Sequence, residues 1–304
     1  RRLRLRRRGP VLNAIRHNMT AAEYFALPAI SRSDLELARE SLKVYQGRKD
    51  GTLPGPNETR ALRIGRLFHL AALEPALFER TVTVAPTTDD DFTGTGAKAR
   101  REAWKALLES WHEALPDGMI VADPAELLTV TSMVHSLRTT QTGAASVARR
   151  LLFGRGESEV TVTWTDEGTG DLTKPMACRA RLDRLIERTA SVSVVDLKST
   201  DDPSPDEFAR SVARYGYHRQ AAWYSTAAEA LTGVRPSFAF VAVRSSPPYE
   251  VSVYELEPEA VEQGERENRE TLAELSRAMA TGNYAASWES GVTTINLPKW
   301  ARSK

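Results

Sequence analysis

The pattern of apolar and polar residues predicts extended strands in the second half of the chain, where side chains alternate with a period of two. Alternating stretches run over Glu157–Trp164 and Lys174–Asp183, and further strand-like stretches over Ser237–Val243 and Glu250–Glu257. A fifth stretch, Val192–Thr200, is rich in valine and predicts a strand that is buried on at least one side. These strands predict a central sheet.

Apolar residues at helical spacing predict helices around these strands. Ser33 and Glu36 have the spacing of a capping box, at the start of a helix that ends near Gly47. A helix between Thr59 and Pro75 is apolar around most of its circumference, which predicts that it is buried. Further helices are predicted over residues 97–115, 124–139, 144–152, 204 onward and 258–280. The chain is therefore expected to form one large α/β domain.

The strand at Val192–Thr200 carries the strongest chemical signal. Asp196 and Lys198 are two residues apart and share one face of the strand. Asp183 ends an earlier alternating run, and the turn-like residues 187–191 let the chain double back, so that Asp183 and Asp196 can meet on neighbouring strands. Two carboxylates beside a lysine predict a metal site; the alternative is a surface hairpin with an ordinary salt bridge.

Two other residues could contribute to this site, and each has a structural alternative. His69 lies in the buried helix one turn after Gly65, and a mid-helix glycine is typical of a close approach by a backbone or ligand. His69 is then either a hydrogen-bonded core residue or a third ligand beside the carboxylates. Glu159 lies on the strand face opposite Val160, and is either an exposed edge residue or a further acidic group of the site.

The helix after the core strand carries a polar residue among aromatic ones. Tyr217, Gln220 and Tyr224 recur at intervals of three and four and so share one face. Packing against the sheet would explain the two tyrosines, whereas Gln220 on the same stripe is better explained by a polar site.

Composition narrows the classes of partner. The net charge is +1, and six of the 41 basic residues lie within Arg1–Arg8, which leaves 35 basic against 40 acidic residues and a charge of −5 for the rest. A broad basic surface is therefore excluded, and any nucleic acid must be bound in a local channel. The arginine-rich start is either a phosphate-binding arm or a segment without a role in the fold.

Other classes are excluded by what the sequence lacks. The single cysteine, Cys178, rules out an internal disulfide and a cysteine-based zinc cluster. No apolar run reaches the roughly 18 residues of a membrane span and no signal-peptide pattern is present, so we expect a cytoplasmic protein without a membrane partner.

Seven short motifs, in order along the chain, resemble the nuclease domain of the RecE, or exonuclease VIII, family of phage recombination. The resemblance covers nearly all of residues 28–301, but none of the arginine-rich first ten residues. One departure is Ser199-Thr200, where a Thr-Thr pair is common. The motifs are ISRSDL from residue 30, LRIGRLFHLAALEP from 62, SEVTVTWTDEGTG from 158, CRARLD from 178, VVDLKST from 194, YGYHRQAAWY from 215 and LPKWA from 297.

The resemblance implies a PD-(D/E)XK fold, with a central mixed β-sheet flanked by helices and an N-terminal helical addition. It divides the chain into a basic arm and N-terminal segment, residues 1–27, and one exonuclease domain, residues 28–301. Within that domain we expect a mainly helical part at 28–155, the catalytic sheet at 156–257 and a C-terminal helix and tail at 258–301.

The resemblance also implies an activity: Mg²⁺-dependent removal of the 5′-ended strand of linear duplex DNA, leaving a 3′ single strand, with Mn²⁺ able to substitute. The implied partners are double-stranded DNA ends, a single-strand annealing protein of the RecT type and further copies of the chain in a ring.

The resemblance gives the site residues roles as well. The implied metal ligands are His69, Asp183, Asp196 and the Leu197 carbonyl. Lys198 would orient or deprotonate the attacking water, Gln220 and Tyr217 would support the nucleophile or the scissile phosphate, and Glu159 would be a further acidic position.

Two alternatives remain open at this stage. A non-cleaving DNA-binding module would be expected to lack one of the acids or the lysine. The second alternative is a different PD-(D/E)XK nuclease, either an endonuclease or a RecB- or Cas4-like enzyme; the RecB- and Cas4-like types would normally carry a helicase domain or four cysteines.

Overall fold

The computed structural model describes residues 15–17, 19–168, 172–285, 289, 291–292 and 294–297. The predicted basic arm at Arg1–Arg8, the end of the predicted turn at 166–171 and the end of the LPKWA motif at 298–301 lie outside these residues. None of the described helices combines the length and the apolar character needed to cross a bilayer.

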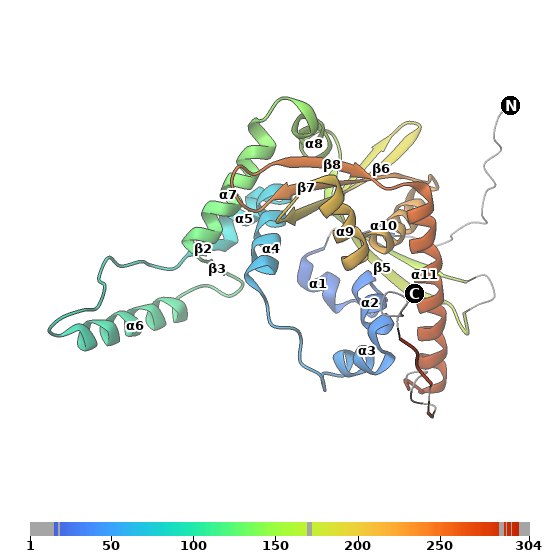
Figure 1. Cartoon of the computed structure of the whole chain (residues 1–304), viewed down its shortest axis with the longest axis horizontal. Helices are drawn as coiled ribbons and strands as arrows, with labels where there is room; N and C mark the ends of the chain where they lie inside the picture. The colour runs from blue at the N-terminus through green and yellow to red at the C-terminus, as the bar shows by residue number, and fades with distance from the viewer. Residues whose placement is uncertain are drawn as a thin grey trace.

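The central element is a six-stranded mixed sheet with the strand order β1-β4-β5-β6-β7-β8 (Figure 1). Strands β6 and β7 are parallel, and every other neighbouring pair in this sheet is antiparallel. A separate parallel pair, β2 and β3, lies outside it. The strands are β1 Ile15–His17, β2 Val82–Val84, β3 Ile120–Ala122, β4 Glu157–Asp166, β5 Met176–Arg188, β6 Ser191–Thr200, β7 Ser237–Arg244 and β8 Val251–Glu255.

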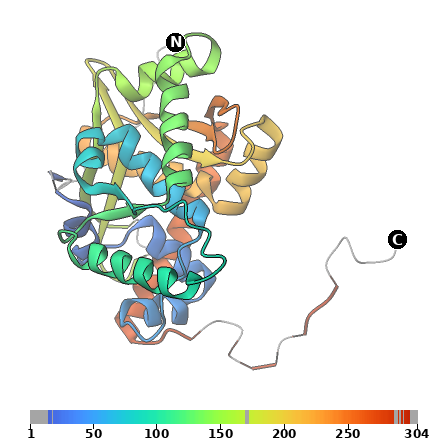
Figure 2. The same cartoon turned by 90° about the vertical axis from the view of Figure 1, so that its left-hand side faces the viewer.

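Helices cover both faces of this sheet (Figures 1 and 2). One face packs against α4, α7 and α8, and the other against α2, α3, α10 and α11, so the expected α/β architecture is confirmed. The helices are α1 Ala21–Ala26, α2 Arg32–Glu40, α3 Leu42–Lys49, α4 Arg60–Leu73, α5 Pro75–Thr81, α6 Ala97–Glu113, α7 Pro124–Thr139, α8 Gly143–Phe153, α9 Pro205–Tyr215, α10 Tyr217–Thr232 and α11 Pro258–Thr281.

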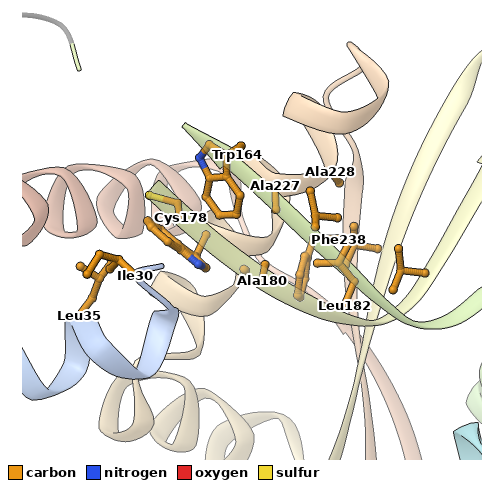
Figure 3. Packing of buried hydrophobic residues seen from close by; sticks show 14 of the residues in the cluster. Ile30, Leu35, Trp164, Cys178, Ala180, Leu182, Ala227, Ala228 and Phe238 are labelled. Atoms are coloured by element: carbon orange, nitrogen blue, oxygen red, sulfur yellow. The ribbon is translucent and has the colours of Figure 1, made fainter. Parts of the chain in front are cut away.

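The larger core lies between the sheet and the α2, α10 and α11 layer. Figure 3 shows Leu35 near Cys178 and Trp164 of the sheet, with Ala227 and Phe238 further along the same layer. Cys178 is fully buried and acts as a small residue of this core. Burial of apolar surface stabilises this layer by roughly 25 cal/mol per Å².

A buried arginine joins the N-terminal segment to this core. Arg179 of β5 is 4% exposed, and its Nη1 donates to the carbonyl oxygens of Tyr24, Phe25 and Leu27 at 2.6–3.1 Å. Ile30 also forms a parallel bridge with Cys178. Because a guanidinium is stable in a protein interior only when its donors are satisfied, this segment and the sheet hold each other in place.

Helix α4 lies directly against β6 on the other face. A Cβ added to Gly65 would lie 3.2 Å from Ser199 Oγ, so the predicted close approach at this glycine is confirmed, and the neighbour is strand β6. The helix begins at Thr59, whose hydroxyl accepts from Leu62 N, and ends before Pro75, as predicted. Leu62 itself is 58% exposed, which corrects the prediction that it is buried.

Helix α6 lies between β2 and β3 in the chain and projects from the body of the molecule (Figures 1 and 2). None of its residues is buried. The acidic loop before it is tied to the helix by an ion pair between Asp90 and Arg100, with Nε and Oδ2 2.6 Å apart.

Local predictions were wrong in three places, and each error has a physical cause. The capping box at the start of α2 uses Ser31 and Asp34, not Ser33 and Glu36, and Ser41 ends α2 and caps α3 where one continuous helix was expected. Both competing spacings fit the same capping rule, so only the backbone entry angle distinguishes them.

The second error concerns β5, which continues past Asp183 to Arg188, so that Asp183 lies within a strand rather than at its end. The third concerns the helix after the core strand, which is divided by Gly216 at φ 65° into α9 and α10. Left-handed backbone there ends the first helix and re-aims the second.

Candidate active site

The site lies where the sheet opens between β5 and β6. Register pairing between these strands ends at Arg184 and Val195, and one residue further each strand carries an aspartate, Asp183 on β5 and Asp196 on β6. The backbone N–H of Leu197 donates to Asp183 Oδ2 at 2.7 Å, in place of a bond to the neighbouring strand. Both predicted carboxylates therefore meet at this opening, because the hairpin brings them to adjacent positions.

Asp196 is fully buried and has two side-chain partners. Lys198 Nζ forms an ion pair with Asp196 Oδ2, and Gln220 Nε2 of α10 donates to Asp196 Oδ1 at 2.7 Å. One neighbour on the same strand face and one residue on a helix thus hold the carboxylate. The polar group expected beside Gln220 is thus the Asp196 carboxylate.

Tyr217 completes this side of the site. Lys198 Nζ lies 4.8 Å from the centre of the Tyr217 ring and 5.9 Å from that of Phe240, which is within the range of a cation–π contact. The left-handed turn at Gly216 places Tyr217 at the first position of α10, one turn before Gln220. Burial raises the pKa of the Tyr217 hydroxyl to about 12, with the Asp196 carboxylate acting in the same direction.

A second group of side chains gathers around Asp183. One ligand atom from each of His69, Glu159 and Asp183 lies within 4.8 Å of the others. His69 Nδ1 is 3.4 Å from Asp183 Oδ2, and 29% of its side chain is exposed. Both His69 and Glu159 therefore lie beside Asp183, and their role as ligands stays a prediction.

Glu159 reaches this position through an unusual backbone conformation. Its φ of 53° is left-handed, which costs a non-glycine residue of order 1 kcal/mol or more. The pairing of Ser158 with Arg184 and of Val160 with Leu182 places Glu159 opposite Asp183. The strain falls at the residue whose carboxylate enters the cluster, which is typical of a functional site.

Burial and like charges shift the proton equilibria of this cluster. Burial raises the pKa of the Glu159 carboxyl to about 7, and the Asp183 charge adds to this shift, whereas Arg181 acts in the opposite direction. Burial and the neighbouring Asp196 also raise the pKa of Asp183. The pKa of His69 is lowered by burial and by Lys198, while a backbone hydrogen bond with Leu197 opposes this shift.

Two residues in this cluster were given no role by the sequence. Arg181 Nε donates to Glu159 Oε2 at 2.5 Å, and its Nη2 lies 3.4 Å from Glu74 Oε2. The sequence did contain a signal for Arg181. Strand alternation places Arg181 on the same face as Asp183, which lies two residues further along. Glu74 had no signal, since it lies at the end of α4 and only the packing of α4 on the sheet brings it near.

The donor set suits a hard divalent cation. Carboxylate oxygens and one imidazole converge in a partly buried space, and burial and like charges raise the pKa values of Asp183 and Glu159, so a bound cation would favour their charged forms. Mg²⁺ and Mn²⁺ prefer such oxygen-rich sites, and imidazole favours Mn²⁺ somewhat more. Of the predicted site residues, His69, Glu159 and Asp183 are placed to hold the ion.

A family comparison agrees with this fold. Residues 31–290 match the family DUF3799, described as a PDDEXK-like domain of unknown function. The chain belongs to this family. No curated protein matches the sequence.

This DUF3799 chain is also similar to proteins of solved structure. A protein from Eubacterium rectale described as a "putative exonuclease" superposes with a TM-score of 0.57 at 11% identity, covering 93% of this chain and 97% of its own. That likeness shows a shared fold. A second structure, SSO0001, has 14% identity over 73% of this chain and 88% of its own, with a TM-score of only 0.30.

The PDDEXK-like fold of this DUF3799 member thus brings all of the sequence-predicted site residues to one region. His69, Glu159 and Asp183 lie on one side of the sheet opening, and Asp196, Lys198, Gln220 and Tyr217 on the other. Leu197 links the two groups, since it follows Asp196 and donates its N–H to Asp183. Tyr224 is nearby as well, because the Asp196 and Asp183 charges, after burial, help to raise its pKa.

Proposed function

We propose that this protein is a cytoplasmic, Mg²⁺-dependent exodeoxyribonuclease that degrades the 5′-ended strand of linear double-stranded DNA and leaves a 3′ single strand. The observation that carries the proposal is the meeting of Asp183 and Asp196 at the sheet opening, with Lys198 bonded to one carboxylate and His69 beside the other. Membership of a PDDEXK-like family supports the nuclease class. The polarity rests on the resemblance of its motifs to the RecE family.

The chain's own groups divide the work of phosphodiester hydrolysis. His69, Asp183, Asp196 and the Leu197 carbonyl would hold the cation, with Glu159 grouped beside His69 and Asp183. When bound, Mg²⁺ would supply an activated water and neutralise charge that develops on the phosphate in the transition state. Lys198 would orient that water as an ammonium, or deprotonate it after releasing its own proton to solvent.

The buried partners of Lys198 fix its position. The Asp196 carboxylate forms an ion pair with the ammonium on one side and the Tyr217 ring faces it on another. Gln220 holds the opposite oxygen of Asp196, so the carboxylate cannot rotate away from the site. Such preorganisation matters because a misplacement of about 1 Å can reduce a catalytic rate by roughly a hundredfold.

Substrate access and assembly form the rest of the proposal. Outside its first eight residues the chain has a charge of −5, so DNA ends are held by enclosure rather than by a broad basic surface. We propose a ring-shaped homo-oligomer for this reason, with a RecT-type single-strand annealing protein as the partner that receives the 3′ strand.

The test is cleavage of duplex DNA labelled on either strand. The wild-type protein with Mg²⁺ should shorten the 5′-ended strand of linear duplex, leave covalently closed circles intact and lose activity in a chelator. Rapid cutting of closed circles would favour an endonuclease of the same fold, and loss of the 3′-ended strand would reverse the polarity. Binding of DNA without cleavage would favour a non-cleaving module.

A further inference from the structure

Arg181 is the one basic side chain of the cluster that the proposed mechanism does not use. It extends from β5 two residues before Asp183 and is 13% exposed. Its Nε binds Glu159 and its Nη2 lies near Glu74, but its Nη1 is buried and has no hydrogen-bond partner among the described residues. Other arginines have a buried Nε without a partner, but in the part of the chain that the structure describes Nη1 of Arg181 is the one buried terminal guanidinium nitrogen without an acceptor, and beside the carboxylate cluster it points to an absent ligand.

The ligand that fits is an anion with several oxygens. A guanidinium presents five donors in a rigid fork, which matches the oxygens of a phosphate group, and it never loses its charge in a protein. Charge-assisted bonds of this kind are about twice as strong as neutral ones. In a nuclease site the phosphate at hand is that of the DNA backbone.

Glu159 connects this donor to the cation site. The same carboxylate that accepts from Arg181 Nε at 2.5 Å belongs to the group formed with His69 and Asp183. It cannot serve a divalent cation and the guanidinium equally well, because the two positive charges would repel each other at such short range. Glu74, 30% exposed at the edge of the cluster, is a second acceptor for the guanidinium.

We propose that Arg181 is a phosphate clamp, a side chain that binds a phosphate group of the DNA. Its ion pair with Glu159 occupies the guanidinium until a cation binds Glu159. Without a cation, the guanidinium neutralises Glu159. When Glu159 turns to a bound cation, Arg181 is released towards a phosphate of the DNA strand, and Glu74 keeps it within the site. The proposal deepens the proposed nuclease function and depends on it for the identity of the phosphate.

The scheme predicts effects of opposite sign on cation and DNA. In Arg181→Met a competing cation is removed from Glu159, so Mn²⁺ should bind at least about threefold more tightly in the absence of DNA. The same variant should bind a short duplex in Ca²⁺ at least about tenfold more weakly, because a charge-assisted phosphate contact is lost. Arg181→Lys keeps the charge without the planar fork, so it should bind Mn²⁺ like the wild type and DNA with intermediate affinity.

Arg184 provides the matched control. It is a buried arginine three residues further along β5, and it donates to Ser158 Oγ and the Gly154 carbonyl instead of to the cluster carboxylates. Arg184→Met should therefore affect stability but neither Mn²⁺ nor DNA affinity per folded molecule. If Arg181→Met does not fold, Arg181→Lys carries the DNA measurement.

The measurements are electron paramagnetic resonance titration with Mn²⁺ alone and fluorescence anisotropy of labelled duplex with Ca²⁺. Unchanged or weaker Mn²⁺ binding in Arg181→Met would overturn the exchange, since a residue that merely positions Glu159 weakens the cation site when lost. Unchanged DNA affinity would overturn the clamp. If the wild type binds DNA through Arg181 but never cuts it, the clamp stands and the proposed hydrolysis fails.

Discussion

The buried Glu159 carboxyl gives a prediction about stability that needs no substrate. Its pKa is raised from 4.5 to about 7 by burial and by Asp183. A carboxyl whose folded pKa exceeds its unfolded value stabilises the protein fully below the unfolded pKa, and this contribution is lost as the pH rises through the folded pKa. The free energy of unfolding of the metal-free protein should therefore contain a term that decreases between pH 4.5 and pH 7.

The size of this term follows from the shift. One pKa unit corresponds to about 1.4 kcal/mol, so a shift from 4.5 to about 7 is worth at most about 3 kcal/mol. Glu159→Gln keeps the shape of the side chain and the same backbone strain, but it cannot ionise. The difference in unfolding free energy between wild type and variant should change by up to this amount across the window, in favour of the variant at high pH.

The assay is urea denaturation of both proteins in a chelator at several pH values. His69 contributes with the opposite sign, because a base whose pKa is lowered destabilises the protein as the pH falls, and taking the difference reduces its effect. Addition of Mg²⁺ at pH 7 should stabilise the wild type more than Glu159→Gln. If the unfolding free energies of the wild type and the variant depend on pH in the same way, the raised pKa of Glu159 is refuted.

Three further predictions concern the catalytic groups. Asp196→Asn should keep the Gln220 contact and the fold but lower cleavage of labelled linear duplex by at least about a hundredfold. Asp196→Ala should in addition lower the free energy of unfolding, measured in urea, by about 3 kcal/mol or more, because the largely buried Lys198 loses its counter-ion. Full activity of Asp196→Asn would contradict its role as a ligand. Lys198→Ala should still bind DNA ends in a gel-shift assay but turn over at least about a hundredfold more slowly, so an unchanged single-turnover rate would assign the proton transfer elsewhere. His69→Ala should weaken Mn²⁺ binding in calorimetry and recover part of its activity at high Mn²⁺; a melting-temperature loss alone, with an unchanged rate per folded molecule, would make it a core residue.

Much of this site could be predicted because periodicity alone determines it. The alternation around Asp196 fixes which neighbour shares its face, and that neighbour, Lys198, is its ion-pair partner in the structure. The helical spacing that groups Gln220 with Tyr217 likewise brings both to the same carboxylate and its lysine. Both inferences are local, and they hold whatever the tertiary arrangement.

The sequence did not determine features that depend on competition between similar local signals or on distant packing. Ser31 and Ser33 both offer a cap, and only the bridge between Ile30 and β5 fixes the entry of the chain into α2. The left-handed backbone at Glu159 has no sequence signal, because glutamate is not a residue that favours it. Tertiary contacts impose that conformation, and with it the approach of the carboxylate to Asp183.

The anchor at Arg179 has a practical consequence for recombinant production of the protein. Its guanidinium donates hydrogen bonds to the carbonyl oxygens of residues 24, 25 and 27, and these residues precede the first of the recognisable motifs. An expressed fragment that starts at residue 28 would leave a buried cation with none of these acceptors. Such a fragment would contain every residue of the candidate site and still be expected to accumulate in inclusion bodies, so expression should begin before the Thr20 cap of α1.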